Sequence, residues 1–216
     1  MRTKKTLDAA IVSVMQSALD DFLREHFFSR TQNSLTYSRR ISRGHQRIRV
    51  PARLRPRYRP EAIAHLVPNL TVSFPEVNDL TFEMVGRDEH LVSNIQDVTF
   101  REPLEFSAPK GHYIHRYVYD EKGLHECFDS IREFIAEWVI PFLDECSSIE
   151  SMITLYELHD HRLIKSPRMS LSIAAAHIIL GNPRKAMEVL DETFRAPGPR
   201  KKFAKAFEYV SNLLRE

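Results

Sequence analysis

Residues 35–60 read LTYSRRISRGHQRIRVPARLRPRYRP, and the spacing of these side chains decides how the first half of the chain folds. The odd positions from 47 to 59 hold six arginines, namely Arg47, Arg49, Arg53, Arg55, Arg57 and Arg59. Most even positions hold bulky or apolar residues, namely Ile48, Val50, Leu54 and Tyr58. Successive side chains of a strand point to opposite faces, so the alternation predicts a strand with an apolar face and an arginine face. Pro51, Pro56 and Pro60 each remove a backbone donor, which favours an edge strand or a broken one.

The segment before this strand, residues 35–41, is expected to pair with it as a β-hairpin. We place the two-residue turn at Arg43-Gly44, where glycine can adopt a positive φ. In that register Tyr37 lies opposite Val50, and the apolar side chains of both strands share one face. The arginine-rich segment is therefore expected to form the second arm of an antiparallel hairpin.

The remaining pattern predicts an α+β fold around this hairpin. Further elements are expected at residues 6–28 (helix), 70–74 (strand), 75–86 (helix), 95–106 and 112–119 (strands). After Asp120 the spacing is helical to the end of the chain. This order predicts an antiparallel meander with an N-terminal helix and a C-terminal helical region packed on one side. We expect an α+β core domain over residues 1–145 and a helical subdomain over residues 146–216.

Two local signals refine the helical part. Pro141 falls near the end of the apolar stripe that runs from Leu124 to Phe142, and it is expected to bend the last turn of that helix. Ser147 with Glu150 has the spacing of a capping box, so the next helix is expected to begin there.

Charge is distributed unevenly along the chain. Residues 26–60 contain ten arginines and no lysine, aspartate or glutamate, whereas the whole protein has 31 basic and 29 acidic residues. Without those ten arginines, 21 basic residues remain, and the rest of the chain carries a net charge of −8. The asymmetry predicts an acidic partner for the arginine segment, either in this chain or outside it. Arginine in place of lysine favours planar, paired contacts with carboxylate or phosphate.

Common catalytic and cofactor motifs are missing. The sequence has no GxxxxGK[ST], GxGxxG, GxSxG, HExxH or CxxC motif and only six glycines, which argues against most enzyme classes and predicts no cofactor. Cys127 and Cys146 are expected to be free thiols in a reducing compartment. The first residues resemble neither a signal peptide nor a membrane span, so we expect a cytoplasmic protein without a membrane partner.

One cluster of titratable residues, Glu157-Leu158-His159-Asp160-His161, supports a weaker hypothesis. His159, Asp160 and His161 could hold a metal in a metal-dependent enzyme. The cluster also falls at the expected end of a helix, where polar residues accumulate, and residues two apart on a helix point in different directions.

The arginine strand gives the main functional hypotheses. Its contact residues would be Arg40, Arg47, Arg49, Arg53, Arg55, Arg57 and Arg59 with Tyr37 and Tyr58. The leading hypothesis is a non-catalytic binding protein that engages an acidic protein surface. The alternative is that the same face binds nucleic-acid phosphates, with the two tyrosines stacking on bases. A structural interpretation also stands, in which acidic residues of the helix after Asp120 cover the arginines, namely Glu126, Asp129, Glu133 and Glu137.

The stretch from Phe22 to Val50 resembles the opening of an uncharacterised bacterial α+β domain family. In that family an N-terminal helix leads into a hairpin patterned as aromatic–x–arginine, then glycine, then glutamine and β-branched residues. The matching positions here are Tyr37, Arg39, Gly44, Gln46 and Ile48. Such domains are similar in size and style to immunity proteins that neutralise secreted bacterial toxins. The resemblance implies a toxin-neutralising binding protein and no catalytic residues.

Overall fold

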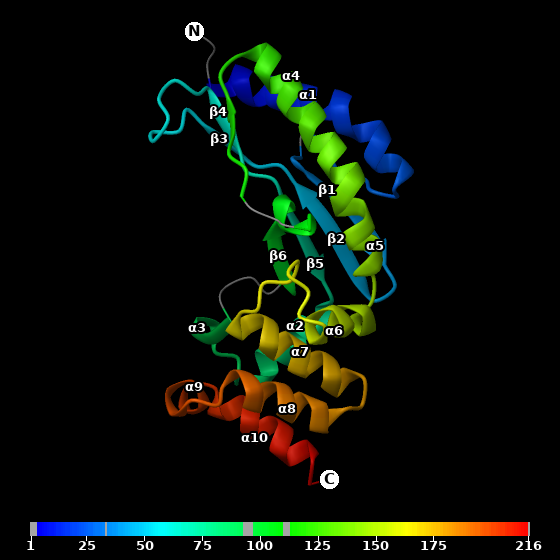
Figure 1. Cartoon of the computed structure of the whole chain (residues 1–216), viewed down its shortest axis with the longest axis vertical. Coiled ribbons are helices and arrows are strands. Elements are labelled where there is room, and N and C mark those ends of the chain that lie inside the picture. The colour runs from blue at the N-terminus through cyan, green and yellow to red at the C-terminus, as the bar shows by residue number, and fades with distance from the viewer. Residues whose placement is uncertain (1–3, 33, 93–96, 110–112, 216) are drawn as a thin grey trace. The chain divides into compact units, whose positions relative to one another are not determined.

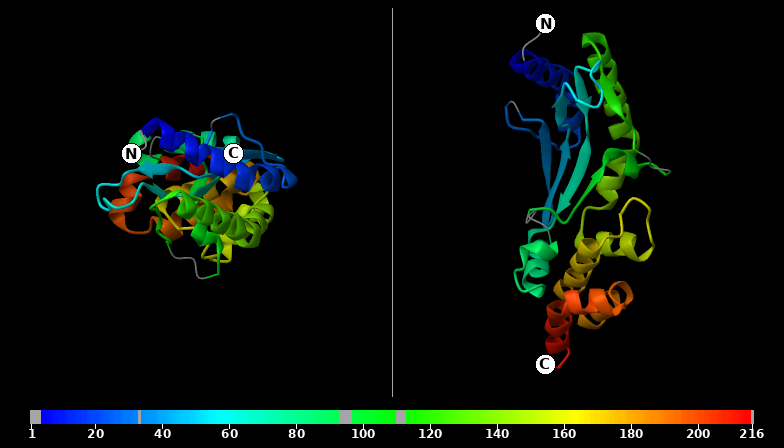
Figure 2. Two further views of the ribbon diagram at one scale, coloured as in Figure 1. Left: turned by 90° about the horizontal axis from the view of Figure 1, so that it is seen from above. Right: turned by 90° about the vertical axis from the view of Figure 1, so that its left-hand side faces the viewer.

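The computed structural model describes residues 4–32, 34–92, 97–109 and 113–215 and has an α+β fold (Figures 1 and 2). The chain forms two compact units, each built from segments that are distant in sequence. The first unit comprises Met1–Arg40, His45–Thr71 and Glu102–Glu145, and the second comprises Ile41–Gly44, Val72–Arg101 and Cys146–Glu216. One division between the units falls between Glu145 and Cys146, and residues 72–101 belong to the same unit as the helical C-terminal part.

The strands form two sheets. The four-stranded sheet has the order β1 (Thr36–Ile41), β2 (Gly44–Arg49), β5 (Asn69–Ser73) and β6 (Phe100–Pro103). The three-stranded antiparallel sheet has the order β3 (Ala52–Leu54), β4 (Ala64–Leu66) and β7 (Arg116–Val118). Residues 95–96 and 112, where two strands were expected to start, lie outside the described residues. The expected strand over 95–106 is shorter than predicted, because residues Leu104–Ser107 form a 3₁₀ turn.

The β1–β2 hairpin keeps the expected faces but not the expected turn. Ser42 and Arg43 form the turn, and the amide of Val50 donates to the carbonyl of Leu35 at 2.9 Å. The register is therefore shifted by two residues, and a shift of two leaves every side chain on its original face. Gly44 does not supply a positive φ. A Cβ at this position would lie 2.0 Å from the carbonyl oxygen of Ser73, so glycine allows β2 to approach β5 closely.

Helices α1 (Lys4–Glu25) and α4 (Glu121–Phe134) pack against each other in the first unit, and α4 also covers one face of β7. The buried stripe of α1 consists of Leu7, Ile11, Val14, Met15, Leu19 and Leu23. α4 continues into a π-helical turn at Ile135–Val139 and then into α5 (Ile140–Glu145). Pro141 explains this turn, because proline has no amide hydrogen and its ring clashes with the carbonyl four residues earlier. The irregular turn thus comes just before Pro141, where the sequence predicted a bend in the last turn of the helix.

The helices of the second unit include α7, whose residues from Met169 to His177 are all buried. They are α2 (Pro75–Met84), α3 (Glu89–Val92), α6 (Ile149–Glu157), α7 (Pro167–Ile179), α8 (Pro183–Thr193), α9 (Pro197–Lys202) and α10 (Ala204–Leu213). The capping box of α6 uses Ser148 and Ser151 rather than Ser147 and Glu150, so that prediction was wrong by one residue. The hydroxyl of Ser148 accepts from the Ser151 amide at 3.1 Å.

A buried polar cluster fixes α2 to the strands of the second unit. The side chain of Asn78 donates to the hydroxyl of Ser73 at 3.1 Å and accepts from the hydroxyl of Thr99 at 2.8 Å. The Thr99 hydroxyl in turn accepts from the amide of Phe74 at 2.9 Å. Each of these groups thus has a partner, which is the condition for burying polar groups without a large penalty.

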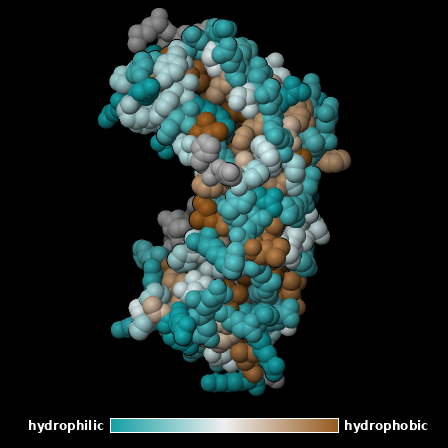
Figure 3. Space-filling model, in the orientation of Figure 1, coloured by the Kyte–Doolittle hydropathy of each residue, from teal (hydrophilic) through white to brown (hydrophobic). Residues whose placement is uncertain are grey.

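Hydrophobic residues on the face drawn in Figure 3 form small, separate patches among hydrophilic ones. Patches of that kind are normal on a protein surface and need no covering partner. No helix within the described part of the chain is both long and apolar enough to span a membrane.

Candidate functional site

The six odd-numbered arginines do not lie in one row. β2 ends at Arg49, and after Pro51 the chain enters β3 of the other sheet, which ends at Leu54. Residue 55 has a positive φ of 47°, and the chain then leaves the sheet as a loop that returns at β4. Arg47 and Arg49 are half-buried in β2, whereas Arg53, Arg55, Arg57 and Arg59 are exposed. The expectation of a broken strand is confirmed, and the single arginine face is replaced by two groups.

Two arginines of the exposed group, Arg53 and Arg59, lie at the outward face of the β3–β4–β7 sheet. Arg53 pairs across the strands with His65, and His65 pairs with Tyr117, so these three residues form one row. The neighbouring rows carry Leu54, Ala64, Leu66, Arg116 and Val118 and face the interior. Because side chains alternate between the faces of a strand, the row at Arg53 points away from the core.

Aromatic rings cover this outward face. We define the ring platform as Tyr58, His65, Tyr113, His115 and Tyr117. The rings of His115 and Tyr117 are stacked at an angle of 14° with centroids 5.5 Å apart. The rings of His65 and Tyr117 are 4.6 Å apart, and Tyr113 meets His115 edge-on at 4.9 Å. Tyr58, which is 54% exposed, meets both His65 and Tyr117 edge-on.

His65 is the buried centre of the platform, with only 4% of the residue exposed. Its Nδ1 is 2.7 Å from the hydroxyl of Tyr58, while its Nε2 is buried and has no hydrogen-bond partner among the described residues. Burial lowers the pKa of His65, and the nearby His115 and the positive charge of Arg53 lower it further. The imidazole is therefore held neutral, and its unpartnered nitrogen is a group that a ligand could satisfy.

Arg59 borders the platform on its loop side. Its guanidinium carbon lies 5.5 Å from the centre of the Tyr117 ring, and its Nε donates to the Tyr119 hydroxyl at 3.4 Å. The same Nε is 2.9 Å from a carboxylate oxygen of Glu61. The hydrogen bond to Tyr119 raises the pKa of Arg59, with further contributions from the charges of Tyr119 and Glu61.

Most of the other predicted arginines lack an ion pair. Among the described residues, no carboxylate forms an ion pair with Arg40, Arg47, Arg49, Arg53 or Arg57. The acidic residues of α4 that were considered as a cover have other neighbours. Glu126 pairs with Lys122, and Asp129 and Glu133 line a small pocket with Arg132. The exposed arginines Arg53 and Arg57 are thus without a carboxylate partner among the described residues.

Tyr37 is not available for stacking. It is only 1% exposed, and its hydroxyl donates to Asp20 at 2.6 Å. Burial raises the pKa of Tyr37, and the bond to Asp20 raises it further. Tyr37 is therefore part of the core, and of the two predicted tyrosines only Tyr58 lies on an exposed surface. Arg40 is exposed near the end of β1, in the other sheet.

The residues of the metal hypothesis have different partners. Asp160 accepts a paired interaction from Arg162, which lowers the pKa of its carboxyl group. Lys165 donates to Nδ1 of His159, and the ring of His161 lies 3.6 Å from Asp160. Across the described residues, no three His, Cys, Asp or Glu side chains are placed to share a metal ion. The cluster occupies the exposed end of α6, with His159 at a positive φ of 56°.

Sequence reasoning missed most of the platform, namely His65, Tyr113, His115 and Tyr117. A signal was present, because aromatic residues occupy every second position from 113 to 119. The pattern alone does not show which face of β7 is covered. The tertiary fold shows that α4 packs on the face opposite these aromatic residues. His65, an isolated histidine between apolar residues, gave no signal in the sequence.

Comparison of the chain with protein-family models, with curated proteins and with solved structures finds no match.

Proposed function

We propose that this protein binds single-stranded nucleic acid on the ring platform of the β3–β4–β7 sheet. The observation that carries the proposal is the stack of His115 on Tyr117 beside the buried His65, bordered by arginines. Aromatic side chains on a sheet surface are a common support for unpaired bases, since every base has a flat face that can stack. A base would extend the existing stack, and the phosphates would reach the arginines.

The charge of the site supports an anionic ligand. Arg53 and Arg57 have no ion pair among the described residues, and Arg59 lies over the Tyr117 ring. The one carboxylate that pairs with these three arginines is that of Glu61, and it pairs with Arg59. A guanidinium group beside an exposed ring can contact a phosphate while the ring contacts the base. The arrangement thus offers both parts of a nucleotide a partner.

A second candidate is an acidic protein partner, including a toxin neutralised by an immunity protein. The observation that favours it is the set of exposed tyrosines beside the arginines, namely Tyr58, Tyr113 and Tyr119. Tyrosine and arginine are enriched among the residues that contribute most to protein–protein binding. Both candidates use the same face, so a binding experiment must compare them directly.

The test measures fluorescence anisotropy with a labelled 12-nucleotide oligo(U), the corresponding oligo(dT), a duplex of equal length, and a polyglutamate peptide of equal charge. We expect tighter binding of the single strands than of the duplex or the peptide. Three arginine–phosphate contacts should give a slope of log affinity against log salt of roughly −2. Equal binding of the peptide would favour the acidic-protein candidate. Absence of any binding to the oligonucleotides at low salt would refute the nucleic-acid function.

A further inference from the structure

The most exposed large apolar side chain in the described part of the chain is that of Phe27, directly after α1. The residue is 85% exposed, and its φ is 65°. A positive φ is strained for a bulky residue, and glycine is the usual residue at this position of a helix end. Phe27 thus costs the fold both backbone strain and exposed apolar area, and a strained residue of this kind points to a functional contact.

The backbone on both sides of Phe27 is held by hydrogen bonds. The amide of Phe28 donates to the carbonyl of Leu23 at 2.9 Å, as in a Schellman motif at the end of a helix. Ser29 and Ser38 then exchange two backbone hydrogen bonds, at 2.9 and 2.7 Å. The ring of Phe27 is therefore presented at a fixed place, which lowers the entropic cost of binding a partner there.

A surface pocket of about 420 Å³ lies between α1 and α4, and it is lined by Phe22, Asp129, Arg132, Glu133 and Ala136. The ring of Phe22 meets that of His26, the residue before Phe27, edge-on at 5.1 Å. The guanidinium carbon of Arg132 lies 5.5 Å from the centre of the Phe22 ring. A cavity of about 150 Å³ already accommodates benzene, so a phenyl ring fits this pocket. An entering ring would contact another ring and a guanidinium group, and both contacts are favourable.

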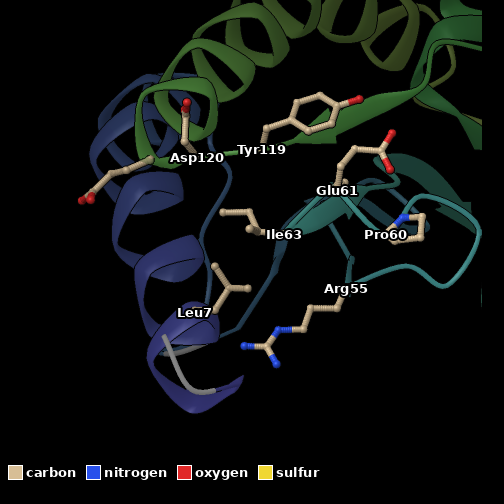
Figure 4. Close-up of a pocket in the computed structure, with 9 residues that line it drawn as sticks. Leu7, Arg55, Pro60, Glu61, Ile63, Tyr119 and Asp120 are labelled. Carbon is tan, nitrogen blue, oxygen red and sulfur yellow. The ribbon is translucent and has the colours of Figure 1, made fainter. Parts of the chain in front are cut away.

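The pocket drawn in Figure 4 is less suited to receive this ring. It has a volume of about 450 Å³ and lies beside Leu7, near the start of α1. Arg55 and Glu121 in its lining already interact with other groups of the chain. With a rise of 1.5 Å per residue, the two ends of α1 are about 30 Å apart. Phe27 and the pocket beside Phe22, in contrast, share one end of α1.

Charges near the ring and in the pocket beside Phe22 are complementary. Among the described residues, neither Asp129 nor Glu133 forms an ion pair. Arg24, three residues before Phe27, pairs with Asp21, and both side chains are exposed. Such a surface pair contributes little energy, so Arg24 can exchange it for a carboxylate of another molecule. A second copy of the chain thus supplies both a ring for the pocket and a cation for its carboxylates.

We propose that a second copy of the chain docks on this surface, with the Phe27 ring of each copy in the pocket beside Phe22 of the other. A surface that carries both a projecting ring and its receptor can close on itself about a two-fold axis, which gives a dimer. The proposal does not rest on nucleic-acid binding, because none of these residues belongs to the ring platform. Each copy has a complete platform, so loss of the dimer should leave the affinity of one platform for a short oligonucleotide unchanged.

Sedimentation equilibrium measures this association directly. The unmodified protein should pass from monomer to dimer with a dissociation constant on the order of 10 µM. Phe27→Ala should weaken the association at least about 100-fold, because both copies lose their aromatic anchor. Leu158→Ala removes another exposed apolar side chain, 73% exposed in the second unit, and should leave the association unchanged. A protein that is monomeric at about 1 mM, or a dimer that persists in Phe27→Ala, would overturn the proposal.

A mixture of two variants tests the contact between ring and pocket. Ala136→Gln places a longer side chain in the pocket and keeps the ring, whereas Phe27→Ala removes the ring and keeps the pocket. Neither variant alone can form the contact, but a dimer of one copy of each can form it once. The equimolar mixture should therefore associate at least about tenfold more tightly than either variant alone. Equal association of the mixture and the separate variants would contradict the pairing of Phe27 with this pocket.

Phe27→Gly separates association from folding. Glycine adopts a positive φ without strain, so this variant should require more urea to unfold than Phe27→Ala. It should lose the dimer to the same extent as Phe27→Ala, because both variants lack the ring. A glycine variant that unfolds at lower urea than the alanine variant would show that the backbone at residue 27 is not strained, which removes the first step of the argument for a contact there.

Discussion

The arginine-rich segment divides into two regions that use the same side chain differently. In the region from residue 30 to 43, three of the four arginines, namely Arg30, Arg39 and Arg43, pair with carboxylates of the same chain. Arg30 contacts Asp20 at 2.7 Å and Arg39 contacts Asp144 at 2.6 Å. In the region from residue 53 to 59, Arg53 and Arg57 have no such partner among the described residues, and Arg53 lies in one row with His65 and Tyr117 of the ring platform. The local sequence of the two regions is similar. They differ in the carboxylates that the fold places beside their arginines.

The comparison implies that the first region stabilises the fold, and it agrees with the proposal that assigns ligand binding to the second. An arginine that is buried with its carboxylate cannot be removed without leaving a charge unpaired. An exposed arginine without a partner contributes little to stability and remains free to contact an anion. Substitutions in the first region should therefore change the free energy of unfolding, and substitutions in the second should change ligand affinity.

The largest effect is expected for Asp20→Ala in the first region. The change removes the carboxylate that pairs with the guanidinium of Arg30, whose side chain is 7% exposed, and leaves the hydroxyl of the buried Tyr37 without its acceptor. The free energy of unfolding, measured by urea denaturation, should fall by about 3 kcal/mol. Asp21→Ala is the matched control, because Asp21 and its partner Arg24 are both exposed. Its change should stay within about 0.5 kcal/mol, and equal losses in both variants would contradict the structural role of Asp20.

The next largest effect is expected for Tyr117→Ala on the platform. Removing the ring takes away the surface on which His115 and His65 stack, and with it the support for a base. Affinity for the 12-nucleotide oligo(U), measured by anisotropy, should fall about 10- to 100-fold. Phe27→Ala removes another exposed ring, 85% exposed and outside the platform, and should leave the affinity unchanged. Comparable losses in the two variants would show that binding does not use the platform.

A smaller effect is expected when Arg53 and Arg57 are both changed to Gln. Loss of two phosphate contacts should make the slope of log affinity against log salt less steep by about 1.4. The free energy of unfolding should change by no more than about 0.5 kcal/mol, because neither arginine has a carboxylate partner among the described residues. Arg184→Gln, an exposed arginine on α8, is the control for general charge. An unchanged slope in the double variant would remove these two residues from the proposed contact surface.

The sequence predicted the fold class and most helices, because these depend on periodicity within one element. The π-helical turn just before Pro141 and the end of α7 near Gly181, which has a φ of 77°, follow from the local chemistry of proline and glycine. The continuous arginine face was wrong because the alternation of residues 47–59 continues across a change of sheet. Period two shows that residues are extended, but it does not show which strand lies beside them.

The candidate site was harder to predict because it combines residues that are distant in sequence. Tyr58 was identified from its place among the arginines, and Tyr37 was identified by the same argument although it is buried against Asp20. The two tyrosines differ only in their tertiary surroundings. His65 and His115 contact each other through the pairing of β4 with β7, and no pattern in the chain encodes that pairing.

The smallest expected effect concerns pH and the buried imidazole of the platform. The pKa of His65 is lowered from its usual 6.5 by burial first, then by His115 and Arg53, and Tyr58 and Tyr117 also lie against its ring. Below pH 6.5 the unfolded chain binds a proton at this position while the folded protein does not, so stability falls as the pH drops toward the folded pKa. Above pH 6.5 the imidazole of His65 is neutral in both the folded and the unfolded state, so it no longer changes the free energy of unfolding with pH.

Urea denaturation between pH 5 and pH 8 tests this expectation. His65→Gln should flatten part of the decline in stability below the usual histidine pKa of 6.5. His177 is the comparison from the second unit, because burial lowers its pKa too while the charge of Glu157 opposes the shift. His177→Gln should remove a separate part of the same decline. If the pH profile of His65→Gln matched that of the unmodified protein, the imidazole of His65 would not be held neutral by the platform.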